Sequence, residues 1–121
     1  MTKIEQEDLD EMLKFAAKNG VSRVGMQVMM KSDNGPLVQK PDGSLANSVR
    51  TSAVLVLTAM TKPKAEPGEH LFYQQFIAEK LIIGEEDSKA LDKSIEEAQA
   101  GVIKKVQELT KAEIFKGRTS P

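Results

Sequence analysis

The chain has 121 residues, of which 40% are hydrophobic and 29% charged, a composition that suits one folded domain and excludes a disordered or membrane-embedded chain. Lys and Arg number 17 and Asp and Glu 18, so the net charge of -1 excludes a uniformly basic nucleic-acid binder. Cysteine is absent, which excludes disulfides and thiolate chemistry. The single histidine, His70, excludes a multi-histidine metal centre.

No targeting or membrane-spanning segment is expected. The first residues are acidic and lack the apolar stretch of a secretory signal. The longest apolar run, Ala53–Leu57, is far shorter than the roughly 20 residues that a membrane span needs. We therefore expect a cytoplasmic protein with no membrane contact.

The first element is predicted to be a helix from about Lys3 to Lys18. Thr2 and Glu5 have the spacing of a capping box, in which each side chain satisfies a free backbone N–H group. One apolar stripe follows at helical spacing, made of Leu9, Met12, Leu13 and Ala16. Asn19-Gly20 supplies the left-handed residue that commonly ends a helix.

After this helix the apolar period changes from 3.6 to 2, which predicts a strand over Val24–Met30. Turn-forming residues at Ser32–Pro36 and Pro41–Ser44 flank a short candidate strand at Leu37–Lys40. The segment Val49–Met60 fits both a helix and a strand. Its β-branched residues favour the strand, as does the need of the first strand for a hydrogen-bonding partner.

Beyond a polar connector with two prolines, Glu69 to Ile83 is predicted to be a helix that ends at Gly84. Its apolar residues occupy more than one stripe, which indicates the buried centre of the fold. A long helix should then begin at Glu85 and run to about Phe115. Its narrow apolar stripe consists of Leu91, Ile95, Ala98, Val102, Val106 and Leu109.

These elements predict an α+β fold in which three helices, the last one long, surround a small antiparallel β-hairpin or meander. Residues 1–116 form a single domain, and residues 117–121 are expected to be a flexible tail. A two-stranded sheet is only marginally stable alone, which favours a homo-oligomer, a dimer or larger. The narrow stripe on the long helix fits an inter-chain seam and an internal core equally well.

No motif indicates an enzyme or a cofactor. His70, with Tyr73 one helical turn away, offers a local acid–base group, but surface or capping chemistry is the favoured interpretation. The acidic runs Asp8–Glu11 and Glu85–Asp87 lie at predicted helix starts, where carboxylates suit the helix dipole without any metal. We therefore predict no catalytic residue, no metal site and no cofactor.

The candidate binding residues lie between Arg23 and Tyr73. Arg23 and Arg50 on one sheet face would suit a phosphate, but no aromatic side chains interleave with the basic residues. Met29 lies on the otherwise polar side of its strand, where an interface and a core position are equally favoured. The candidate binding residues are Arg23, Met29, Lys31, Lys40, Arg50, His70 and Tyr73.

The expected function is that of a small non-enzymatic binding or regulatory protein that acts through protein–protein contact. Inhibitors, adaptors and phage-type accessory proteins belong to this class. The alternative is a nucleotide or nucleic-acid binding protein that uses the central basic residues. The salt dependence of binding distinguishes the two functions, because contacts with nucleic acid weaken steeply as salt is added.

Overall fold

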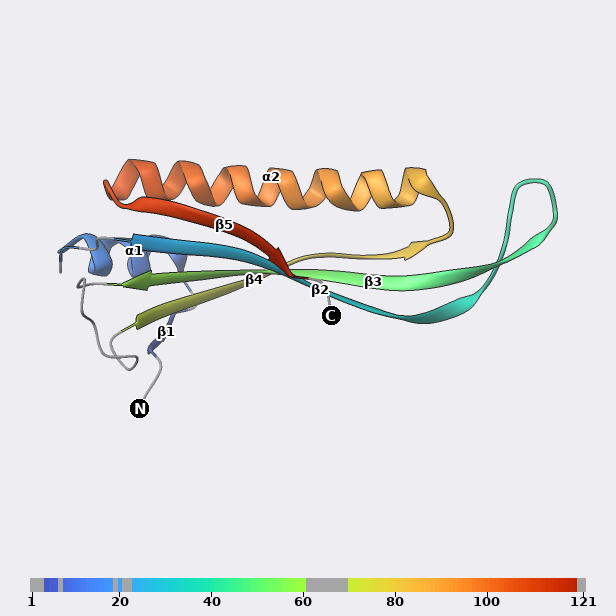
Figure 1. The fold of residues 1–121 in the computed structure, drawn as a ribbon, viewed down its shortest axis with the longest axis horizontal. Coiled ribbons are helices and arrows are strands. Elements are labelled where there is room, and N and C mark those ends of the chain that lie inside the picture. The colour runs from blue at the N-terminus through green and yellow to red at the C-terminus, as the bar shows by residue number, and fades with distance from the viewer. Residues whose placement is uncertain (1–3, 7, 19, 21–22, 61–69, 120–121) are drawn as a thin grey trace.

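The computed structural model describes residues 4–6, 8–18, 20, 23–60 and 70–119. Figure 1 shows a long helix along one side of a twisted sheet, and a two-stranded hairpin that projects beyond the end of that helix. The elements in chain order are β1 (Ile4–Gln6), α1 (Leu9–Lys18), β2 (Arg23–Gln39), β3 (Leu45–Met60), β4 (His70–Ile82), α2 (Glu85–Leu109) and β5 (Glu113–Thr119).

The sheet has five strands in the order β1-β4-β3-β2-β5. The central strand β3 is antiparallel to both β2 and β4, whereas each edge strand pairs in parallel, β1 with β4 and β5 with β2. Parallel pairing requires a crossover, and α2 supplies it between β4 and β5. This crossover carries the long helix across the sheet.

The hydrophobic core lies between one face of the sheet and both helices. Directly opposed residues of β2 and β3 share this face, as in the pairs Val24–Ala59 and Met26–Leu57. The core side chains contributed by the helices are Met12, Leu13 and Ala16 from α1, and Leu91, Ile95, Val102 and Val106 from α2. Both helices therefore cover the same face, which we call the covered face.

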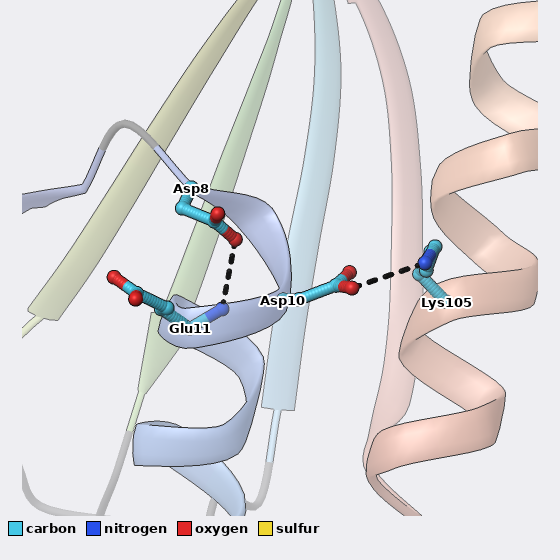
Figure 2. A network of polar contacts seen from close by, with 4 residues as sticks. All are labelled: Asp8, Asp10, Glu11 and Lys105. Carbon is cyan, nitrogen blue, oxygen red and sulfur yellow. Dashed lines mark hydrogen bonds and ion pairs between the residues drawn. The ribbon is translucent and has the colours of Figure 1, made fainter.

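Helix α1 begins and ends through local polar contacts. The Asp8 carboxylate accepts a hydrogen bond from the backbone N–H of Glu11 at 3.1 Å, so Asp8 is the N-cap (Figure 2). Gly20 has a φ of 80°, the left-handed conformation that follows many helices. An ion pair of 3.1 Å between Lys105 Nζ and the Asp10 carboxylate joins the two helices (Figure 2).

Helix α2 is also closed by side chains at both ends. The Asp87 carboxylate accepts a hydrogen bond from the backbone N–H of Ile83 at 3.0 Å, which satisfies a donor just before the helix. At the other end Thr110 is the C-cap, and both its backbone N–H and its hydroxyl donate to the Val106 carbonyl. Thr110 Oγ1 then accepts from the backbone N–H of Ala112, which turns the chain toward β5.

The far ends of β2 and β3 form a two-stranded projection, residues 35–48, which we call the hairpin arm (Figure 1). Its tip is a tight turn in which Gly43 has a φ of 90°. The Asp42 carboxylate accepts hydrogen bonds from the hydroxyl and the backbone N–H of Ser44, at 2.6 and 2.9 Å. These bonds lower the pKa of Asp42 below its ordinary value.

The expectation of three helices around a small hairpin is wrong, because the described residues form two helices and a five-stranded mixed sheet. The main error is the helix predicted over Glu69–Ile83, where the chain forms strand β4. Its apolar residues occupied several helical stripes because both faces of this strand carry them. β4 also satisfies the outer backbone groups of β3, from Val49 to Met60.

The predicted helix boundaries also change. The first helix starts at Leu9 rather than Lys3 because Glu5 lies in β1 and Asp8 is the cap; Thr2 lies outside the described residues. The long helix starts at Glu85 as predicted but ends at Leu109, where Thr110 caps it. β5 extends to Thr119 and so includes much of the expected tail. The strand predicted over Val49–Met60 is confirmed within β3.

Candidate functional site: the open face of the sheet

The side of the sheet opposite the helices is the most distinctive surface of the protein. Within the described part of the chain, neither helix packs on this side, which we call the open face. Its large apolar side chains are well exposed: Phe76 by 63%, Met29 by 51% and Phe115 by 48%. Exposed apolar side chains that share one face commonly mark an interaction site.

The register of the three long strands arranges the open face in rows. The central row consists of Met29 on β2, Val54 on β3 and Phe76 on β4. Val54 is only partly buried and lies between the two more exposed side chains. The middle of the open face is therefore an apolar row that crosses three strands.

The rows on either side differ in chemistry. Toward the hairpin arm, the next described row contains Lys31, Ser52 and Glu79, which places opposite charges on the two outer strands. Toward the other end, two rows from the centre, Gly25, Thr58 and Phe72 share a row. Lys31 and Glu79 therefore lie on one side of the apolar centre, and Gly25 and Phe72 lie on the other.

A shallow hollow of about 290 Å³ lies on this face between β3, β2 and β5. Gly25 and Gly117 form part of its lining, and a Cβ atom added at either glycine would meet no atom within 4 Å. Phe115 also lines the hollow, and the Arg23 guanidinium lies 4.4 Å from the centre of its ring. The hollow has room for an apolar side chain from outside the chain.

Charges of both signs alternate over the open face. Among the described residues of this face, the cations Arg23, Lys31 and Arg50 are balanced by the carboxylates Asp33, Glu79 and Glu113. Arg50 and Glu79 form a loose ion pair of 3.9 Å, and both side chains are about half exposed. The open face is therefore not an electropositive surface.

The predicted binding residues separate into several places. Arg23, Met29, Lys31 and Arg50 lie on the open face, and Met29, for which an interface and a core position were equally favoured, is 51% exposed. Along β2, Arg23 and Lys31 are separated by roughly 26 Å at about 3.3 Å per residue. One phosphate group therefore cannot contact both residues.

The other three predicted residues lie elsewhere. Lys40 is in the turn of the hairpin arm. Tyr73 lies on the covered face, where its ring packs against the core and its hydroxyl donates to Gln75 Oε1 at 3.2 Å. His70 begins strand β4 rather than a helix, and its side chain lies outside the described residues.

The sequence interpretation missed the aromatic residues of the open face, Phe72, Phe76 and Phe115. All three fell in segments that were predicted to be helical, where exposed and buried positions follow a different period. The signal that would have found them is the preference of aromatic residues for strands, combined with the prolines that precede β4.

Other kinds of site receive no support in the described part of the chain. No three residues of the types His, Cys, Asp and Glu lie close enough there to hold a metal ion. A second hollow, of about 340 Å³, lies where the ends of the two helices meet and is lined by Ala17, Gly20 and Gln107–Lys111. No helix in the described residues has the length and hydropathy needed to cross a membrane.

Comparisons with known proteins give no relative for this chain: no family model matches it, and neither curated proteins nor solved structures show a significant similarity.

Proposed function

We propose that the protein is a non-enzymatic interaction module that binds another protein through the open face of its sheet. The observation that carries this proposal is the apolar row of Met29, Val54 and Phe76 on a face that neither helix covers. A protein partner would remove these side chains from water at about 25 cal/mol per Å² of apolar surface.

The charge distribution favours a protein over a nucleic acid. A nucleic-acid site gathers cations along the phosphate backbone, whereas here Asp33, Glu79 and Glu113 balance the cations of the same face. Mixed charges around an apolar centre are the usual composition of a protein interface. Salt should therefore have little effect on the affinity of this face.

The hairpin arm offers a second contact to the same kind of partner. Leu37 and Leu45 are exposed by 64% and 67%, and their cross-strand partners Asn47 and Gln39 place both leucines on one side of the arm. The polar side chains of Lys40, Asp42 and Ser44 lie in the turn beside them. The arm thus presents an isolated apolar pair at the end of the molecule.

Photo-cross-linking inside the cell tests this proposal. A benzoylphenylalanine placed at position 76 replaces an exposed aromatic ring by a similar one that reacts with whatever lies against it. We expect a covalent adduct with a protein, and we expect Met29→Asp to reduce its yield by roughly tenfold because it places a charge in the apolar row.

The matched control is the same photo-reactive residue at position 104, an exposed site on α2. That position should give no specific adduct. Equal adducts at both positions, or adducts at position 76 with nucleic acid alone, would contradict the proposed function.

A further inference from the structure

We propose that a second copy of this chain covers the open face, in a two-fold symmetric dimer whose axis runs close to β3 and passes Val54. This inference rests on the proposed function and names the partner. It follows from the register of β2, β3 and β4, because β3 lies between the other two strands. A two-fold axis along β3 places β2 of one copy against β4 of the other, twice.

Charge complementarity is the first argument for a second copy. Lys31 and Glu79 flank Ser52 in the same row, one on β2 and the other on β4. The two-fold axis therefore brings Lys31 of each copy opposite Glu79 of the other. Side chains of both types are long enough to meet between two sheets packed about 10 Å apart.

The apolar row shows the same self-complementarity. Met29 and Phe76 flank Val54, so the dimer packs each Met29 against Phe76 of the other copy and places the two Val54 side chains together. Contacts between a methionine sulfur and an aromatic ring are favourable by about 0.3–1.5 kcal/mol. This row is the centre of the interface.

Shape agrees with charge and polarity two rows from the centre, on the side away from the hairpin arm. Gly25 on β2 and Phe72 on β4 flank Thr58, so the ring of Phe72 from one copy lies above Gly25 of the other. Gly25 lines the hollow of about 290 Å³. The largest side chain of the row therefore meets the smallest.

Arg50 lies on the proposed axis and would face its own copy. Two features offset this like-charge contact. Asp33 is its direct cross-strand neighbour, and Glu79 pairs with it at 3.9 Å. The position is also about 13 Å along the strand from Val54, where the twist of the two sheets separates them.

The open face has the area that a dimer needs. Four strands spaced about 4.8 Å apart, over roughly 26 Å from Arg23 to Lys31, give on the order of 500 Å² per copy. Two copies then bury on the order of 1,000 Å² of flat area, and side-chain relief adds more; specific interfaces begin near this size.

A charge-swap experiment on the full chain tests the proposal by sedimentation equilibrium. Wild type should be a dimer at micromolar concentration. Lys31→Glu and Glu79→Lys should each weaken the dimer by roughly 10–100-fold, because each substitution creates two like-charge contacts. An equimolar mixture of the two variants should recover dimers, since both contacts in the mixed dimer join opposite charges.

Controls separate this geometry from a general effect of charge. Lys104→Glu, on the exposed side of α2, should leave the dimer unchanged. Gly25→Ala adds a Cβ atom that meets no atom of its own chain within 4 Å, so it should weaken the dimer while the melting temperature of the monomer does not fall. This second variant keeps the test decisive even if a charge variant folds poorly.

Two results would overturn the inference: a wild type that stays monomeric, or charge variants whose mixture does not recover dimers. The proposed function would survive either result if the cross-linker at position 76 captured a different protein. Capture of a second copy at that position supports both proposals, and capture of no protein removes both.

Discussion

The two faces of the sheet are built from the same strands, but their side chains are buried to different extents. On β3, Leu55 and Leu57 are fully buried beneath the helices, whereas Val54 and Val56 between them are only partly buried on the open face. The chain satisfies its covered face by itself. Within the described residues the open face keeps apolar side chains that no helix covers, which teaches that alternating burial along a strand need not coincide with alternating polarity.

The largest expected effect is a loss in the free energy of unfolding, and it appears when one leucine from each face is replaced by alanine. Leu57→Ala should lower the free energy of unfolding by about 2–5 kcal/mol, because it leaves a cavity in the packed core. Leu81→Ala on the open face, where the side chain is 41% exposed, should lower it by less than about 1 kcal/mol. Urea denaturation of both variants measures the difference, and equal losses would contradict the assignment of the faces.

A smaller loss of stability is expected when the N-cap of α1 is removed. Asp8→Ala removes the acceptor of the Glu11 N–H group and should cost about 0.5–2 kcal/mol of stability. Asp8→Asn keeps an oxygen acceptor and should cost less. Thermal denaturation distinguishes them, and the capping role would be refuted if the two variants lost the same stability.

The ion pair between the helices should contribute less to the stability of the fold than the N-cap does. Lys105 and Asp10 are both about half exposed, so a double-mutant cycle with alanine at each should give a coupling of about 0.2–1 kcal/mol. Adding salt should reduce this coupling because the charges are screened. A coupling of several kcal/mol would mean that the pair is buried in solution.

The smallest effect belongs to the hairpin arm. Because the pKa of Asp42 is lowered in the folded chain, its ionised form stabilises the turn above the ordinary pKa of 3.8, and this contribution is lost as the pH falls through the folded pKa. The amide NMR signal of Ser44 should therefore shift in that acidic range. Asp42→Asn should abolish the shift; a signal in the wild type that did not move would argue against the hydrogen bonds at the tip.

The strand over Val24–Met30 could be predicted from the sequence because its apolar residues follow a period of two, and the strand over Val49–Met60 could be predicted from its β-branched residues and from the need of the first strand for a hydrogen-bonding partner. Strand β4 could not, because a β-bulge near Ile77 inserts an extra residue opposite Ala53 and Val54. The open-face positions are even-numbered before the bulge, as at Phe72 and Phe76, and odd-numbered after it, as at Leu81, so the period of two is broken within the strand. An irregular strand was therefore predicted to be a helix.

The site was predictable only in part. Met29 stood out because an apolar residue interrupted a polar alternation, which favoured an interface and a core position equally, and the structure places it on the open face with 51% exposure. The rest of the face depends on which residues of β4 lie opposite β3, and that register cannot be read from composition. The basic residues looked like a cluster in the sequence, yet pairing of the strands spreads them over the length of the sheet.

The most direct test of the account is a disulfide across the proposed axis. The chain has no cysteine, so Val54→Cys introduces a single thiol that faces its own copy if two open faces pack together. Mild oxidation should then yield a covalent dimer of twice the 13.3 kDa chain mass, while Lys104→Cys on α2 should stay monomeric. Equal yields from both variants, or no covalent dimer from Val54→Cys, would contradict the pairing of the open faces.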